Sequence, residues 1–154
     1  MYTLTMVHFL LVLTCTISVL VASKRIMVNL LAYNLNHLKS IIIIFNEYKL
    51  ICEAGWKPTI FFYTGIDLDN EILSYLEEKS YCYSTNSSIP MKVIKFDHSL
   101  GIYLSQVHRT YVENHIHDYD VFIYQEDDII FEYSHLVAYL YETKKLQEIS
   151  SDVQ

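Results

Sequence analysis

Glycine is scarce in this sequence, which has only three Gly among its 154 residues. The phosphate-binding loops of P-loop nucleotidases and dinucleotide-binding dehydrogenases need closely spaced glycines, because the backbone must approach the phosphates. The chain lacks such a loop, so both classes of protein are disfavoured. It also lacks internal repeats, low-complexity tracts and any segment typical of an interdomain linker. Its length and its 52% hydrophobic content fit one domain with a substantial core.

Basic residues are outnumbered, with 11 Lys and Arg against 18 Asp and Glu and a formal net charge of −7. A negatively charged chain repels polyanions, which argues against nucleic acid as the main partner. The acidity is also localised, because every charged residue from position 113 to position 142 is acidic. Such a segment either faces water or holds a cation.

Charged residues are absent from positions 2–22, where Leu, Val, Ile, Met and Phe dominate. About 20 apolar residues are enough to cross a bilayer as a helix. The small residues Val21, Ala22 and Ser23 also offer a site for a signal peptidase. Residues 1–23 are therefore predicted to be a signal-anchor or a cleaved signal peptide, with residues 24–154 as the domain. We expect a lumenal domain at a Golgi or ER membrane, or a secreted one if the signal is cleaved.

Cysteine is rare too, and one of the three, Cys15, lies inside the hydrophobic segment. Cys52 and Cys82 can pair in an oxidising compartment, although free cysteines are equally often buried as small hydrophobic residues. Asn86 begins an Asn-Ser-Ser sequon for N-glycosylation, a pattern that also arises by chance. Both features agree with a lumenal domain, and neither establishes one.

Apolar runs of strand length alternate with segments of helical periodicity. The predicted strands are residues 26–33, 59–64, 91–96 and 121–124. Helices are predicted between them, with a polar loop at 80–90 and a last helix that begins near Ser134. This order predicts an α/β fold with a mostly parallel, Rossmann-like sheet.

In open sheets of this kind, ligands bind beyond the carboxyl ends of the strands. The predicted strand ends at that edge include Tyr33 with Asn34 and the segment 125–128. The latter contains the triplet Glu126-Asp127-Asp128, which stands between two apolar runs. Neighbouring carboxylates suit Mg²⁺ or Mn²⁺, which take further ligands from substrate phosphates. The alternative is a solvated turn or a helix cap made of acidic residues.

Residues 119–129, YDVFIYQEDDI, resemble the block "YD-apolar-EDD" of a GT-A glycosyltransferase family in which EDD replaces Asp-x-Asp. Residues 105–111 resemble the helix that precedes this block, and residues 53–56 with strand 59–64 resemble the family's first helix-to-strand junction. The resemblance covers most of residues 24–145. Only the triplet is a specific motif, and the remainder is a compatible α/β pattern.

This resemblance implies a GT-A-like fold and a transferase of hexosyltransferase type that binds a nucleotide-sugar donor with Mn²⁺ or Mg²⁺. Asp128 would be a direct metal ligand, Glu126 would hold the metal's waters or the donor ribose, and Asp127 would stand between them in the metal and donor site. Tyr33 and Asn34 would meet the nucleotide base, or else be a packed tyrosine and a helix cap. Arg109 would reach a phosphate, or else be a solvated surface charge.

Members of this family continue well past the triplet with the elements that bind the acceptor and supply any base. We therefore expect the GT-A-like fold to be incomplete at the C-terminus, with no catalytic residue assigned and a glycan or protein acceptor left open. The rival hypothesis is a truncated or inactive membrane-tethered lumenal domain without catalysis. A phosphohydrolase with an aspartyl nucleophile is disfavoured, because the first strand ends in Ala32-Tyr33-Asn34 without an acidic residue.

Overall fold

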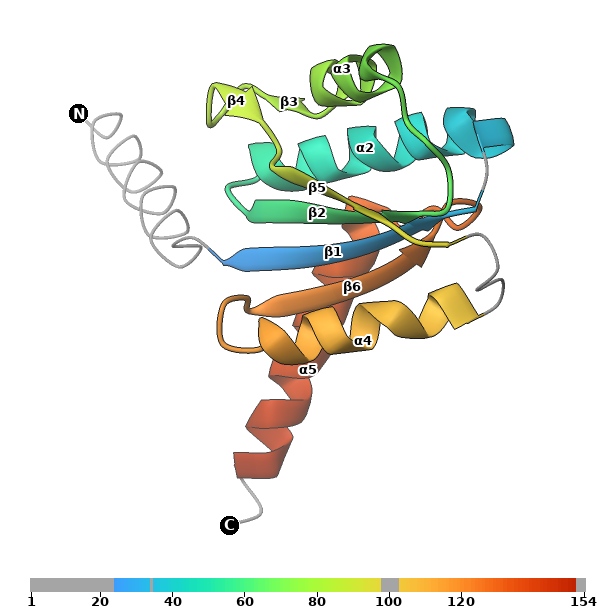
Figure 1. Ribbon diagram of the computed structural model, residues 1–154. Coiled ribbons are helices and arrows are strands. Elements are labelled where there is room, and N and C mark those ends of the chain that lie inside the picture. The colour runs from blue at the N-terminus through green and yellow to red at the C-terminus, as the bar shows by residue number, and fades with distance from the viewer. Residues whose placement is uncertain (1–23, 34, 98–102, 152–154) are drawn as a thin grey trace, which may run out of the picture.

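The computed structural model describes residues 24–33, 35–97 and 103–151. Four parallel strands form one sheet in the order β5-β2-β1-β6, and helices pack on both of its faces (Figure 1). The elements in chain order are β1 (Arg25–Ala32), the 3-10 helix η1 (Leu35–His37), α2 (Leu38–Glu53), β2 (Lys57–Thr64), α3 (Asn70–Lys79), β3 (Tyr81–Cys82), β4 (Ser87–Ser88), β5 (Met91–Lys95), α4 (Leu104–Asn114), β6 (Val121–Glu126) and α5 (Tyr133–Ser151). The predicted α/β class and parallel sheet are confirmed, and the arrangement is compatible with a Rossmann-like fold.

The two central strands, β1 and β2, are buried on both faces for nearly their whole length. This is why their sequences are almost continuously apolar instead of alternating. One face of β1 packs against α2 and the start of α5, and the other packs against α4. The sheet is thus the middle of three layers, in the arrangement that parallel sheets require (Figure 1).

Helix α2 forms although four consecutive isoleucines, Ile41 to Ile44, favour strands locally. Ile41, Ile44 and Tyr48 recur on one face and are fully buried against the sheet, whereas Ile43 is 45% exposed. Burial at helical spacing therefore outweighs the local preference. The helix ends before Gly55, whose φ of +92° lies in the left-handed region that glycine adopts without strain.

The segment 80–90 corrects one prediction, because it is not only a loop. Two short antiparallel strands, β3 and β4, form a hairpin there, with Tyr81 opposite Ser88 and Cys82 opposite Ser87. A disulfide between Cys52 and Cys82 attaches this hairpin to the last turn of α2. Strands of two residues are too short to show a period of two, so no sequence pattern indicates them.

Two predictions fall on residues outside the described part of the chain. These are the signal or anchor at residues 1–23 and the site residue Asn34. Among residues 24–33, 35–97 and 103–151, no helix combines the length and the apolar character needed to cross a membrane.

Candidate functional site

The candidate site lies where the order of strands reverses in the sheet. From β1 the chain proceeds outward through β2 to β5, and then returns to add β6 on the opposite side of β1. In open α/β sheets the crevice at such a reversal, at the carboxyl ends of the strands, is where ligands bind. The residues that follow β1 and β6 therefore meet at the most favourable position of this fold for a ligand site.

The acidic triplet forms the end of β6 and a tight turn. Glu126 is the last residue of the strand, and Asp127 and Asp128 are the two central residues of a β-turn. The turn is closed by the backbone N–H of Ile129, which donates to the carbonyl of Glu126 at 3.1 Å. The three carboxylates thus leave the backbone in different directions, and their surroundings differ accordingly.

Gln125 supports this turn from inside the core. Its side chain is fully buried, accepts a hydrogen bond from the Tyr48 hydroxyl of α2, and donates to the carbonyl of Ile129. Buried amides are costly unless they are hydrogen-bonded. These two hydrogen bonds explain why the polar residue Gln125 is tolerated in β6 after four apolar residues. They also fix the turn relative to α2.

Asp127 is only 1% exposed, and both of its carboxylate oxygens face protein groups. Oδ2 accepts a hydrogen bond from the backbone N–H of Tyr33 at 3.1 Å. Oδ1 lies 3.1 Å from Nδ1 of His37, an ion-pair distance, although this contact does not meet hydrogen-bond geometry. The middle acid therefore joins the ends of β1 and β6 and the start of α2.

Glu126 lies on the opposite face, toward α4. The hydroxyl of Tyr124 donates to Glu126 Oε1 at 2.8 Å, and the Tyr124 ring packs on His108 with 4.4 Å between ring centroids. Burial raises the pKa of the Tyr124 hydroxyl well above its usual value, as do its hydrogen bond to Glu126 and the charge of that carboxylate. Tyr124 therefore remains a proton donor that orients Glu126.

Asp128 is exposed. Within the part of the chain that the structure describes, no hydrogen bond or ion pair engages its carboxylate or Oε2 of Glu126. Glu126 and Asp128 thus offer oxygens to an incoming ligand, whereas Asp127 does not.

Tyr33 connects these carboxylates with the end of β1. Its pKa is raised above the usual value of 10 first by partial burial and then by the charges of Glu126, Asp127 and Asp128. All three carboxylates thus lie close enough to this phenol to oppose its ionisation. A cation would be attracted to the same place.

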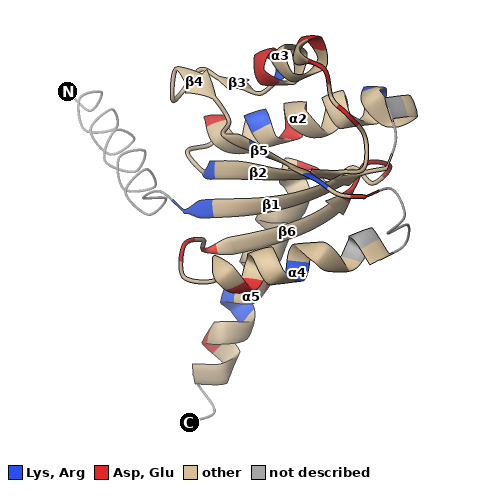
Figure 2. Cartoon of the chain, viewed as in Figure 1, with Lys and Arg blue, Asp and Glu red and all other residues tan. Residues whose placement is uncertain are grey.

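Charge is distributed unevenly between the two ends of the sheet. Arg25 and Lys57 are the first residues of β1 and β2, so basic residues begin these strands, and they lie at the same end as the acidic residues Asp118 and Asp120 of the loop before β6 (Figure 2). At the carboxyl ends, Lys95 of β5 forms an ion pair with Asp67. The triplet is not balanced in this way by Lys or Arg within the described residues, so the acidic end is the one suited to a cation.

The remaining predicted site residue that the structure describes, Arg109, lies on α4 and is exposed. No hydrogen bond or ion pair joins it to the triplet in the described ranges. Sequence reasoning missed His37, Tyr48 and Tyr124 as neighbours of the triplet. His37 and Tyr48 are more than 75 residues away along the chain, so only the folded sheet brings them there.

A cavity of about 490 Å³ lies at the opposite, amino end of the sheet. Its lining includes Arg25, Lys57, Thr85, Asp118 and Tyr119, and no residue of the triplet. At this end of the sheet, the backbone N–H of Arg25 donates to the Asp120 carboxylate at 2.7 Å, and the backbone N–H of Asp120 donates to the Arg25 carbonyl at 2.9 Å. Among the described residues, Asp118 is the one acidic residue that lines this cavity, whereas three acidic residues stand in a row at the carboxyl edge, so we assign the candidate site to the triplet.

Within the described residues, no three His, Cys, Asp or Glu side chains converge as a ready-made metal site. Compared with protein-family models, with curated proteins and with solved structures, the chain matches none of them.

Proposed function

We propose that this chain binds a nucleotide-sugar donor together with Mn²⁺ or Mg²⁺, as the donor-binding part of a GT-A-type glycosyltransferase. The observation that carries the proposal is that the three residues of the triplet have different surroundings. Asp127 is buried and holds the turn, while Glu126 and Asp128 present carboxylate oxygens at the reversal of strand order. Asp127 fixes the turn to the end of β1, so its two neighbours are held at a defined position.

The residues present fit a hard divalent cation. Mg²⁺ and Mn²⁺ prefer oxygen ligands, and in phosphate-binding sites they commonly take one or two protein carboxylates together with phosphate oxygens and water. Asp128 and Glu126 supply two such carboxylates, so a third protein ligand is not required. When bound, the ion would neutralise the charge of the nucleoside diphosphate as it leaves the sugar.

The side chains around the triplet would each contribute to donor binding. Tyr124 orients Glu126 through its hydroxyl, and His108 supports the Tyr124 ring from α4. Asp127 fixes the distance between the triplet and the end of β1. Tyr33, half-buried beside the three carboxylates, presents an aromatic ring on which a nucleotide base can stack. The acceptor, a lumenal glycan or protein, would be bound elsewhere.

Calorimetric titration of the full chain in detergent with nucleoside diphosphates, with and without Mn²⁺, tests this function. We expect binding that requires Mn²⁺ and that weakens at least about tenfold, or about 1.4 kcal/mol, in Asp128→Asn and in Glu126→Gln. Asp118→Asn is the matched control, because it removes one exposed acidic charge at the amino end of the sheet. This variant should bind like the wild type.

Two results would overturn the proposal. One is a folded wild-type chain, verified by circular dichroism, that binds no nucleoside diphosphate at any Mn²⁺ concentration. The other is binding that Asp118→Asn weakens as much as Asp128→Asn does, since the effect would then come from net charge alone. The first result favours a membrane-tethered lumenal domain without catalysis.

A further inference from the structure

The hairpin between β3 and β4 carries Asn86 at an exposed position. Asn86 has a φ of +53°, in the left-handed region, which asparagine tolerates better than most residues. Its backbone N–H closes the turn by donating to the carbonyl of Tyr83 at 3.2 Å. The residue is thus the last one of a tight turn, directly before β4, and it is exposed.

The side-chain amide of Asn86 is engaged on one side only. Its Oδ1 accepts a hydrogen bond of 2.7 Å from the hydroxyl of Tyr81, and in the described residues no hydrogen bond engages its Nδ2. Ser88, two positions later, is half-buried in β4. Asn-x-Ser is the acceptor sequence for N-linked glycans, and in this protein it coincides with an exposed turn.

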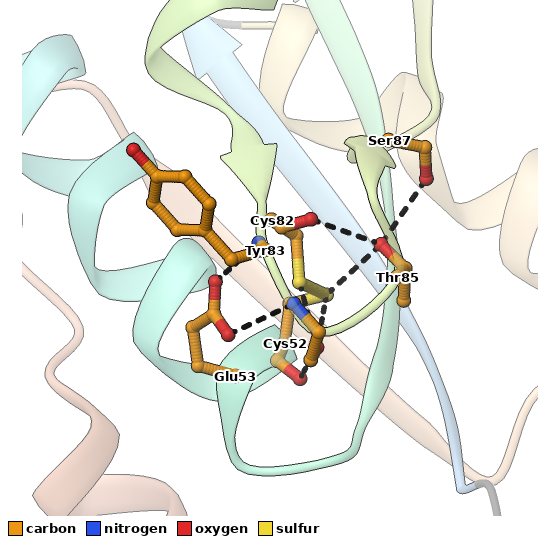
Figure 3. The surroundings of a disulfide bond; sticks show 7 residues. Cys52, Glu53, Cys82, Tyr83, Thr85 and Ser87 are labelled. Atoms are coloured by element: carbon orange, nitrogen blue, oxygen red, sulfur yellow. Dashed lines mark hydrogen bonds between the residues drawn. A yellow bond between two sulfur atoms is a disulfide. The ribbon is translucent and has the colours of Figure 1, made fainter.

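The hairpin is attached to α2 by one disulfide, which forms in an oxidising compartment, and by two hydrogen bonds. The disulfide between Cys52 and Cys82 joins it to α2, and the Glu53 carboxylate accepts hydrogen bonds from the backbone N–H groups of Tyr83 and Ser84 (Figure 3). Disulfides of this kind persist in the lumen of the secretory pathway, where N-linked glycans are also added. The disulfide and the sequon are independent features, four residues apart, that indicate the same compartment.

We infer that Asn86 is an N-glycosylation site, with the Ser88 hydroxyl as the second recognised group of the sequon. In the reaction, Asn86 Nδ2 forms a bond to the anomeric carbon of an oligosaccharide carried on a lipid diphosphate. The bond from that carbon to the diphosphate oxygen breaks, the lipid diphosphate leaves, and Nδ2 gives up one proton.

The glycan would lie far from the acidic triplet. Thr85 and Ser87 line the cavity at the amino end of the sheet, together with the first residues of β1 and β2. The eight residues of β1, at about 3.3 Å each, separate the two ends of the sheet by roughly 25 Å. A glycan on Asn86 therefore leaves the carboxyl edge open, and this inference does not depend on the proposed function.

Cell-free translation of the full chain with ER microsomes, followed by peptide-N-glycosidase digestion and gel electrophoresis, tests the assignment. Asn86-Ser87-Ser88 is the only sequon in the 154 residues, so we expect one glycosylated band that digestion removes. Asn86→Gln and Ser88→Ala should abolish this band. Ser87→Ala is the matched control and should keep it, because the central position of the sequon accepts any residue except proline.

Protease protection measured on the same samples makes a negative result informative. A chain that is protected inside the microsomes but lacks the glycosylated band would overturn the assignment. A chain that remains outside and digestible would overturn it as well, because Asn86 would never meet the transferase. Retention of the band in Asn86→Gln would show that the modification lies elsewhere.

Discussion

The backbone N–H of Tyr33 donates a hydrogen bond to Oδ2 of Asp127 at 3.1 Å, across 94 residues of sequence. This bond connects the end of β1 with the turn after β6, at the reversal of strand order. Since Asp127 is buried by this contact, only its two neighbours in the triplet face outward. The stability of the fold therefore depends on Asp127, whereas Glu126 and Asp128 are the members of the triplet that we propose to bind a cation.

Replacing Asp127 with Ala should destabilise the fold. The substitution leaves the buried N–H of Tyr33 without its acceptor and removes the charge beside His37, for a loss of about 1–3 kcal/mol in the free energy of unfolding. Asp128→Ala is the control, and its exposed position predicts a change within about 0.5 kcal/mol. Urea unfolding followed by circular dichroism measures both. Equal stability of the two variants would contradict the role given to Asp127.

The contact between Tyr48 and Gln125 should show strong energetic coupling. Tyr48→Phe removes the donor to a buried amide oxygen and should cost about 1–3 kcal/mol. Gln125→Leu should cost a similar amount, because it also removes the donor to the Ile129 carbonyl. The double variant should lose less unfolding free energy than the sum of the losses in the two single variants. The difference, which is the coupling energy, should be about 0.5–3 kcal/mol. Additive losses in a double-mutant cycle would show that the two side chains act independently.

Reduction of the disulfide should destabilise the domain without unfolding its sheet. The bond between Cys52 and Cys82 closes a loop of 30 residues, and loss of such a bond typically costs about 2–5 kcal/mol. The urea midpoint should therefore fall when dithiothreitol is added. In the variant with both Cys52→Ser and Cys82→Ser, the midpoint should already be low and should not respond to the reductant. A lower urea midpoint of that variant on addition of dithiothreitol would show that the reductant acts through a cysteine other than Cys52 and Cys82.

Alkaline pH should destabilise the protein through its buried tyrosines. Burial raises the pKa of Tyr48 and Tyr63 far above the ordinary value of 10, and the pKa of Tyr33 and Tyr124 is raised as well. The folded state thus keeps protons that the unfolded state loses. The unfolded state binds fewer protons above pH 10, so stability is fully present below that pH and declines as the pH rises above it.

Ultraviolet titration of tyrosinate at increasing pH checks this prediction. Part of the tyrosinate absorbance should appear only together with the loss of circular dichroism, because burial raises the pKa of Tyr48 and Tyr63 in the folded state. Tyr48→Phe should reduce that part. Ionisation of all tyrosines in one reversible step near pH 10, with the fold intact, would contradict the burial described above.

The strands could be predicted from the sequence because central parallel strands are apolar throughout. Helix α2 was predicted as well, although Ile41–Ile44 obscured its period, because Phe45 and Tyr48 continued the buried face. The hairpin at 80–90 was missed, since strands of two residues carry no period. Its disulfide remained one of two open possibilities, because two cysteines in a sequence do not reveal whether their side chains meet.

The candidate site was predictable only in part. The position of the triplet at the end of a strand followed from the alternation of strands and helices, but the sequence presents its three carboxylates as equivalents. Their different surroundings arise from long-range contacts, chiefly those of Asp127 with Tyr33 and His37. Such contacts depend on which strand lies beside β1, and one sequence does not encode that order in any local pattern.

The order β5-β2-β1-β6 also governs when the sheet can assemble as the chain leaves the ribosome. β1, β2 and β5 can pair as soon as each is synthesised, but one edge of β1 must wait for β6, whose start lies about 95 residues further on. Pairings this distant are slow to form, and an open strand edge invites aggregation in the meantime. The acidic turn is therefore the last part of the sheet to be positioned, and the edge that we propose to bind a cation is complete only once β6 has joined β1.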